Sequence, residues 1–374
     1  MKKFFGVVLS IALTSALVLS FVGCADNGSG NNTGDAEVGV IYSIKTDDDG
    51  NEYAVADKYA LSEADAKKVS NNDYKDILVD LEINEYTDED GNKYPVKEIA
   101  PSAFANQLTI KSVRFGDNVT TIGSACLAGC ANLESLTVPF VGNTVDAKND
   151  GKLLGYLFGA ASSENSSYIT MNYNATGSKS YYIPNALKTV TVTGDVLSDY
   201  AFYGMNLSTV NLTGNVQSIG DYAFYGMRYL TTYKIPASVR SIGAYAFSGC
   251  NNLTTIDFSE ADALTSIGAS AFERCELLGY GKDNTVMLPP ALSALGAKAF
   301  YFCTSLKSVD LSGSAVSALN EYTFYGCEKL VNVRLKAGTN LSLGVFSACD
   351  ALDRTAIVNI DSATGTDVAF DKND

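Results

Sequence analysis

The sequence predicts a β-rich solenoid, a right-handed stack of short coils that is capped at both ends. Three observations favour it. First, a phrase recurs along the chain: an apolar residue, Gly, any two residues, Ala-Phe, any one residue, Gly, and then Cys or Met. Second, the period of this phrase is nearly constant. Third, a short stretch of alternating apolar residues accompanies each copy. Self-similarity at a fixed period is the signature of repeat architectures, in which each unit buries its apolar face against its neighbours.

The recurring phrase sets the period of the coils. The aromatic residues of successive copies are Phe202, Phe224, Phe247, Phe272, Phe300, Phe324 and Phe346. The intervals between them are 22, 23, 25, 28, 24 and 22 residues, in or near the range of about 20–29 residues that is typical of leucine-rich repeats. With earlier copies centred on Phe104 and Leu127, we expect leucine-rich-repeat coils over residues 99–350.

Each coil is expected to contain two short strands and an Ala-Phe segment. Stretches such as 207–212 and 253–258 carry apolar residues two positions apart, which indicates a strand. Stretches such as 216–220 predict a second, shorter strand that ends in a turn, followed by a helical or irregular piece with Ala-Phe. Because Gly tolerates positive φ, we expect Gly220 and Gly243 to make that turn.

Three regions precede the coils. In residues 1–23, Lys2 and Lys3 followed by an apolar run predict a signal peptide, and a retained transmembrane anchor is the alternative because the run is nearly long enough to cross a bilayer. Residues 24–36 predict a flexible polar tether that begins at Cys24. Residues 37–98 are expected to form an N-terminal β-rich cap with a short helix near 62–69.

Two acidic turns lie within the predicted cap, at 47–51 and 88–92. Neither fits a calcium-binding EF-hand loop, because Lys45 and Tyr86 fall at the first ligand position. Asp-Gly pairs of this kind commonly close hairpins, so we expect hairpin turns.

The repeat is interrupted at about 140–182. Residues 153–159 are consistent with a degenerate coil, and the polar stretch 160–179 predicts a loop or hairpin that protrudes from one face. Residues 351–374 are expected to form a C-terminal cap and tail.

Most of the cysteines occupy one column, three residues after the Phe or Leu of the phrase. They are Cys130, Cys250, Cys275, Cys303, Cys327 and Cys349. Met205 and Met227 fill the same column in two coils, which favours buried thiols over disulfides. A bridge between neighbours is the alternative, since stacked coils lie about 5 Å apart. The chain has no His and no close Cys pair in this column, so we expect no metal or cofactor.

Two surfaces are candidates for binding. Tyrosines flank the Ala-Phe pair in two columns, Tyr200, Tyr222, Tyr245 and Tyr322 before it and Tyr203, Tyr225, Tyr301 and Tyr325 after it. Such rings either contact a protein or sugar or pack against one another, and we favour packing. The outward column of the main strand reads Arg114, Thr137, Thr191, Asn211, Lys234, Asp257, Met287, Asp310 and Arg334. Its charges change sign repeatedly and suit no single electrostatic partner.

Composition excludes some function classes. A net charge of −15 disfavours nucleic acid and anionic lipid as partners. The absence of His, of a Gly-x-Ser-x-Gly elbow and of a phosphate-binding loop leaves no catalytic residue to name, so we expect a non-enzyme. A hydrolase of carbohydrates that relies on carboxylates is the third alternative for the function.

The phrase Ile-Gly-x-x-Ala-Phe-x-Gly-Cys, the strand Leu-x-x-Val-x-Leu and the segments 154–160 and 182–190 together resemble the BspA-like leucine-rich-repeat family of bacterial surface proteins, over about residues 95–350. Phe21-Val22-Gly23-Cys24 resembles the lipobox of bacterial lipoproteins, although Phe21 stands where Leu is usual.

The two resemblances imply an exported bacterial protein whose Cys24 is lipidated and holds it outside the cytoplasmic membrane, with no other contact to that membrane. They imply a non-catalytic binding or adhesion module for an extracellular protein or glycan, which we expect to be a monomer. A structural cell-surface or assembly protein without a soluble ligand is the alternative.

Overall fold

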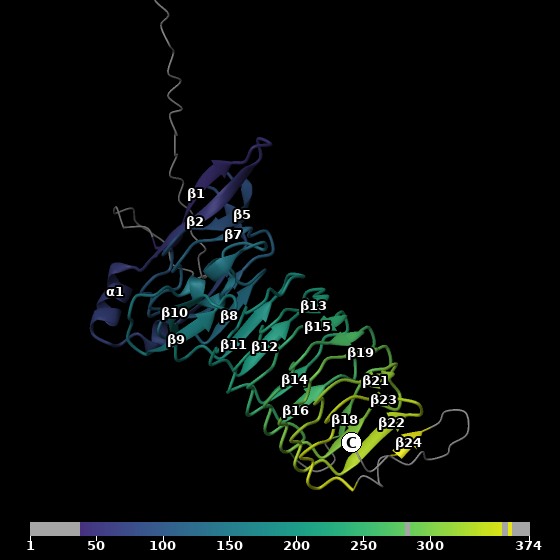
Figure 1. Cartoon of the computed structure of the whole chain (residues 1–374). Helices are drawn as coiled ribbons and strands as arrows, with labels where there is room; N and C mark the ends of the chain where they lie inside the picture. Colours follow the sequence, from purple (N-terminus) through teal and green to yellow (C-terminus); the bar gives the residue numbers. More distant parts are fainter. Residues whose placement is uncertain (1–37, 281–284, 354–357, 361–374) are drawn as a thin grey trace, which may run out of the picture.

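The computed structural model describes residues 38–280, 285–353 and 358–360 as an elongated β-rich solenoid (Figure 1). The predicted signal peptide, Cys24, the tether and most of the 351–374 region lie outside the described residues, so these assignments and the domain boundaries stay predictions.

The main strands of successive coils form the long side of the solenoid. They are β6 (Ile110–Phe115), β8 (Ser135–Val138), β11 (Thr189–Val192), β12 (Thr209–Leu212), β14 (Thr232–Lys234), β16 (Thr255–Asp257), β18 (Thr285–Met287), β20 (Ser308–Asp310), β22 (Asn332–Lys336) and β24 (Val358–Ile360). Neighbours pair in parallel and in register, as Val190 with Val210 in β11 and β12, which confirms the predicted strand. Within the described chain, β12 does not pair with β14, nor β16 with β18.

The second side consists of the predicted short strands. They are β7 (Thr121–Ile122), β13 (Ser218–Ile219), β15 (Ser241–Ile242), β17 (Ser266–Ile267), β19 (Ala294–Leu295), β21 (Ala318–Leu319) and β23 (Asn340–Leu341). The run from β13 to β19 is continuous and parallel. This second sheet therefore holds together coils that the main sheet leaves unpaired.

The Ala-Phe segments form the third side and are irregular turns without helix, which we call the Phe turns. The N–H groups of Tyr222, Phe224 and Gly226 donate to carbonyl oxygens of the next coil at 2.8–2.9 Å. The seven Phe rings from Phe202 to Phe346 are buried and stack with centroids 4.8–5.7 Å apart. The column runs through a continuous core that also contains Val, Ile, Leu and Cys side chains, and stacked aromatic rings stabilise it beyond the area that they bury.

The expectation of positive φ at Gly220 and Gly243 is wrong. A Cβ on Gly243 would lie 2.6 Å from the N of Asp221 and 2.7 Å from the carbonyl carbon of Gly220, in the preceding coil. Glycine is needed there because two backbones approach closely. The left-handed conformation falls instead on Tyr222 (φ 56°) and on Gly226 (φ 69°), which belong to the Phe turn.

The N-terminal region is built on hairpins, as predicted. Its elements are β1 (Gly39–Thr46), β2 (Glu52–Ala60), α1 (Glu63–Ser70), the 3₁₀ helix η1 (Lys75–Ile77), β3 (Val79–Ile83), β4 (Glu85–Thr87) and β5 (Lys93–Ile99). The two acidic turns close the antiparallel pairs β1–β2 and β4–β5. The expected helix is α1, and the Ser62 side chain caps it by accepting from the N–H of Asp65. Because β3 pairs with β6 and β5 with β7, this region continues both sheets of the solenoid.

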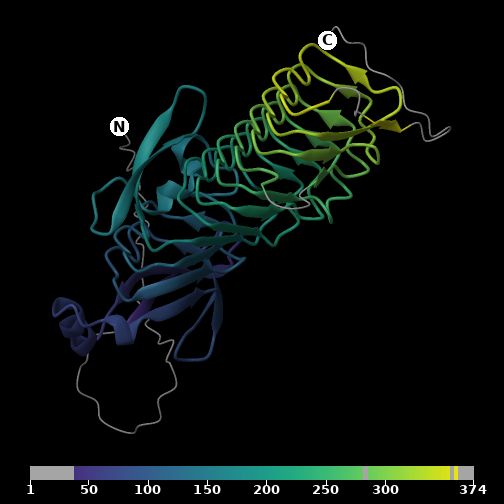
Figure 2. The same ribbon diagram turned by 90° about the horizontal axis from the view of Figure 1, so that it is seen from below.

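The interruption of the repeat contains a degenerate coil and a hairpin. The 3₁₀ helices η2 (Asn149–Lys152) and η3 (Leu154–Leu157) precede β9 (Ser166–Asn172) and β10 (Ser178–Pro184), which pair antiparallel. The N–H of Leu127 donates to the carbonyl oxygen of Leu157, the bond that joins other Phe turns, which confirms the degenerate coil. The predicted protrusion is the β9–β10 hairpin, and Figure 2 shows it in teal beside the row of Phe turns.

Candidate interaction surfaces

The tyrosines of the Phe turns pack against one another, as the sequence favours. The ring of Tyr222 stacks on those of Tyr200 and Tyr245 with centroids 4.8 Å apart and planes 9° apart in both pairs. Tyr203 and Tyr225 stack at 4.7 Å. Apart from Tyr200, which is buried, these side chains are half-buried, so each ring packs on its neighbour and leaves an edge on the surface.

Lysines lie over the ends of the tyrosine stacks. The Nζ of Lys152 is 5.0 Å from the ring centroid of Tyr200, and that of Lys298 is 5.5 Å from the ring of Tyr301. Burial raises the pKa of the Tyr203 and Tyr222 hydroxyls above the usual value, so both remain neutral donors near pH 7. The surface therefore presents ordered rings, neutral hydroxyls and flanking cations.

The structure divides the predicted tyrosine surface into two groups. The coil of Phe272 carries Ser270 where the preceding coil has Tyr245, and Glu273 where the following coil has Tyr301. In the same coil, Arg274 lies over the ring of Phe302 at 5.5 Å. The first group is Tyr200, Tyr203, Tyr222, Tyr225 and Tyr245, and the second is Tyr301, Tyr322 and Tyr325. No single aromatic face extends along all the coils.

A shallow groove of about 510 Å³ runs beside the first group. Its lining residues come from β9, from the Phe turns and from the loops that follow them. They are Tyr168, Ile169, Thr170, Tyr203, Gly204, Asn206, Tyr225, Gly226, Arg228, Gly249, Asn251 and Arg274. The groove combines aromatic walls, amides and two arginines, which is the chemistry that a peptide or a glycan chain requires. Tyr168 and Arg228 were not predicted as part of this site. The hairpin brings Tyr168 to this face, whereas Arg228 directly follows the Phe turn of Phe224, at a position that no predicted column contains.

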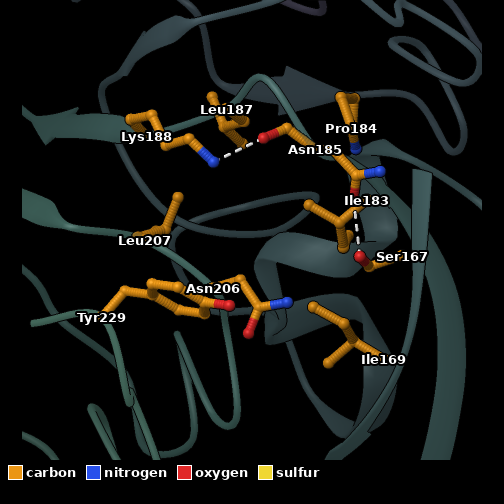
Figure 3. Close-up of a pocket in the computed structure, with 10 residues that line it drawn as sticks. All are labelled: Ser167, Ile169, Ile183, Pro184, Asn185, Leu187, Lys188, Asn206, Leu207 and Tyr229. Carbon is orange, nitrogen blue, oxygen red and sulfur yellow. Dashed lines mark hydrogen bonds between the residues drawn. The ribbon is translucent and has the colours of Figure 1, made fainter. Parts of the chain in front are cut away.

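A smaller pocket of about 200 Å³ lies at the base of the hairpin (Figure 3). The Nζ of Lys188 donates to the carbonyl oxygen of Asn185 at 2.5 Å, and the Ser167 hydroxyl donates to Asn185 Oδ1 at 2.6 Å. Tyr229, which is 59% exposed, and Asn206 line the opposite wall. These polar groups were not predicted as a site, since no repeat column contains them.

The outward column of the main strands lies on one side of the sheet, with partners in register. Lys234 lies opposite Asp257, and Asp310 opposite Arg334. Lys234 also pairs with Glu260 at 2.7 Å, and Arg334 with Asp310 at 3.5 Å. Neighbouring coils thus neutralise much of the charge of this column, which leaves a mixed polar face.

The cysteine column is a ladder of buried thiols, as predicted. All seven cysteines within the described residues are unbridged thiols. In six coils the Sγ donates to the carbonyl oxygen of the Phe or its equivalent in the preceding coil, at 3.0–3.2 Å. Burial raises the pKa of Cys130 and Cys250 to about 12, so neither is a reactive thiolate at neutral pH. The described part of the chain contains no cluster of three or more His, Cys, Asp or Glu that could hold a metal ion.

Comparison with known proteins gives the same architecture. A family model described as a BspA-type leucine-rich-repeat region matches six copies, over residues 92–196, 173–282 and 281–372. No curated protein matches the chain. In the described residues, no helix has the length and apolar character that a membrane crossing requires.

Solved structures similar to the chain come from several bacteria. A leucine-rich-repeat protein from Bacteroides ovatus is 19% identical with a TM-score of 0.40, and the match covers 83% of this chain and 79% of that one. A leucine-rich cell surface protein from Faecalibacterium prausnitzii is 22% identical with a TM-score of 0.32, with 86% and 94% covered. The leucine-rich-repeat protein of T. pallidum is 24% identical with a TM-score of 0.30, with 53% and 92% covered.

Proposed function

This chain belongs to the BspA-type leucine-rich-repeat family, and from that premise we propose that it is a bacterial cell-surface protein that binds an extracellular protein or glycan without catalysis. The observation that carries the proposal is the groove beside the first tyrosine group, where Tyr203 and Tyr225 are already stacked and partly exposed. Side chains that are ordered before binding lose little conformational entropy when a ligand docks.

The groove suits a broad, shallow contact. Its lining includes Gly204, Gly226 and Gly249, which have positive φ and, as glycines, place no side chain above the turn. A ligand can therefore approach the backbone, while Arg228 and Arg274 supply cationic donors at the walls. Affinity would be spread over rings, amides and guanidinium groups, as in recognition surfaces rich in Tyr.

The test uses residues 25–374 as a soluble protein, a panel of extracellular-matrix proteins and glycans, and surface plasmon resonance at physiological salt. A double variant with Tyr203→Ala and Tyr225→Ala is expected to weaken a saturable interaction at least about tenfold, because rings of this kind dominate binding free energy. The matched control is Tyr301→Ala with Tyr325→Ala, which removes an equivalent stack of the second group, at 5.1 Å, outside the groove. Equal losses in both variants, or no binding across the panel, would contradict the proposal and favour a structural role, and turnover of a glycan would favour a hydrolase.

Attachment through Cys24 is part of the proposal. The lipobox-like residues 21–24 and the polar stretch after them support a lipidated cysteine on a tether. Full-length protein expressed in a bacterium is expected to fractionate with membranes and to incorporate labelled fatty acid, whereas Cys24→Ala is expected to do neither. Incorporation that survives in Cys24→Ala would overturn the assignment.

A further inference from the structure

The main sheet is open between β12 and β14, and we call this opening the seam. The Cα atoms of the two strands lie for the most part more than 8 Å apart, whereas hydrogen-bonded strands lie about 4.8 Å apart. The same two coils stay joined on their other sides. The N–H of Gly204 donates to Tyr225 O at 2.7 Å, and that of Gly243 donates to Ile219 O at 2.8 Å. The opening is thus local to the main-strand side.

Both edges of the seam present unpaired backbone groups. The N–H groups of Thr209 and Thr213 point to β11, where they donate to Lys188 and Val192 carbonyl oxygens at 3.0 and 2.9 Å. Because alternate residues of a strand point their backbone groups to opposite sides, those of Val210 and Leu212 face the seam.

The opposite edge follows the same rule. The N–H of Ile235, just after β14, donates to Asp257 O in β16 at 2.9 Å. The backbone groups of Thr232 and Lys234 therefore face the seam from the other side. Unpaired backbone groups at a strand edge are a template for pairing with another strand.

Tyr233 lies on the core side of the seam. It occupies the inward column where β12 has Val210 and β16 has Ile256, and its ring packs on Phe224 and Phe247 at 5.0 and 5.2 Å. A buried Tyr fills much more space than the Val or Ile of the neighbouring coils, so a bulky aromatic side chain forms the core side of the groove at the seam.

We propose that the seam binds one extended segment of a partner protein, which inserts as a strand between β12 and β14. A strand hydrogen-bonded to both edges requires them about 9.6 Å apart, twice the ordinary spacing, and the groove at this place has a volume of about 670 Å³. Recognition would follow the strand-addition mode, in which the main chain supplies affinity and alternate side chains supply specificity.

The lining of the groove defines the partner's chemistry. Side chains of the inserted strand that point inward meet Val210 and Tyr233, and those that point outward lie beside Asn211 and Lys234. The fitting segment alternates apolar β-branched residues with Thr, Ser or Asn. The inference rests on the proposed binding function, because it names the class of partner that would bind at the seam. It does not involve the tyrosine groove.

The probe is a blocked peptide with the sequence of residues 187–194, which contains β11, a strand that already pairs with β12. Binding to the 25–374 protein is measured by calorimetry. Lys234→Pro removes the N–H that faces the seam, while Lys234→Ala removes the side chain and keeps that N–H, and an edge strand tolerates proline at such a position. We expect Lys234→Pro to weaken binding about tenfold or more, the effect of a lost hydrogen bond, and Lys234→Ala to remain within about threefold of wild type.

Hydrogen exchange gives an independent measurement. The amides of Val210, Leu212 and Lys234 are expected to gain protection when the peptide is added, while that of Gly226, which is already bonded within the Phe turns, is expected to stay unchanged. A peptide with lysines in place of its two valines is expected not to bind. No binding by the wild type at millimolar peptide, or equal binding by Lys234→Pro and wild type, would overturn the inference. If Lys234→Pro still binds a member of the panel of extracellular-matrix proteins and glycans, the tyrosine groove binds its ligand without the seam.

Discussion

The thiol of Cys250 donates a hydrogen bond to the carbonyl oxygen of Phe224, 3.1 Å away in the preceding coil. The same bond recurs wherever the column contains Cys, and it explains why a small apolar residue with a weak donor suits this place. Each Cys lies beside a Phe stack and gives a second donor to a buried carbonyl oxygen, since Phe224 O also accepts from the N–H of Met227 at 3.3 Å.

The buried thiols are expected to make the fold sensitive to alkali. The pKa of Cys250 rises from a reference value of 9.0 to about 12 in the folded chain, so its contribution to stability is complete below pH 9 and is lost as the pH rises toward 12. Cys250→Met, which imitates Met227 of the preceding coil, removes this titration. Between pH 8 and pH 10, the free energy of unfolding of wild type should fall by about 1.4 kcal/mol more than that of the variant. Urea titrations under reducing conditions measure the difference, and parallel pH profiles would refute it.

Close approach between coils predicts a strong effect of Gly243→Ala. The added Cβ would overlap the backbone of Asp221 and Gly220, so we expect a loss of about 1–3 kcal/mol in the free energy of unfolding. Gly313→Ala is the matched control, because a Cβ there meets no atom within 4 Å. Thermal and denaturant unfolding of the two variants checks the prediction, which fails if they are equally stable.

Backbone strain predicts that Ala348→Gly stabilises the protein. Ala348 has φ 56° in a column where Gly226 and Gly249 have φ 69° and 74°. The left-handed conformation costs a non-glycine residue about 1–2 kcal/mol. Glycine avoids that strain but loses more conformational entropy on folding, which costs about 0.5–1 kcal/mol. We therefore expect Ala348→Gly to raise the free energy of unfolding by about 0.5–1 kcal/mol. Gly249→Ala should change stability in the opposite direction, and a loss of stability in Ala348→Gly would contradict this explanation.

Removing the hydroxyl of Tyr233 is expected to stabilise the fold. That hydroxyl is buried without a hydrogen-bond partner, which costs about 1–3 kcal/mol, so Tyr233→Phe should raise the free energy of unfolding by about 1 kcal/mol. Tyr53→Phe provides the contrast, because its hydroxyl donates to Glu98 at 2.6 Å and its loss should destabilise the protein by about 1 kcal/mol. Denaturant midpoints that move in the same direction for both variants would argue against this account.

Periodicity in the sequence was enough to predict the coils, the strands and the buried columns. A residue that recurs at one place in each coil, such as Phe224 or Cys250, meets its equivalents in the next coil, so its burial and stacking follow from the repeat alone. The N-terminal hairpins and α1 were also predictable, because turn and capping residues act locally.

Features that depend on how closely coils approach were not predictable from the same pattern. Gly243 recurs like a turn residue, yet its role is to admit a neighbouring backbone, and Tyr222 adopts positive φ although its side chain disfavours it. Tyr233 fits the apolar alternation of a strand, and nothing in that pattern indicates that β14 does not pair with β12. The candidate surfaces could not be fully predicted from the repeat either. The β9–β10 hairpin brings residues that lie in no repeat column next to the tyrosines.

The three backbone ladders also determine how the molecule bears load. Because each coil is bonded only to its neighbours, tension along the solenoid axis is transmitted through these ladders in series. Where all three are present the coils resist together, but at the seam the main-strand ladder is missing and two ladders bear the tension. A pull along the axis is therefore expected to part the solenoid first where the main-strand ladder is missing, between β12 and β14 or between β16 and β18.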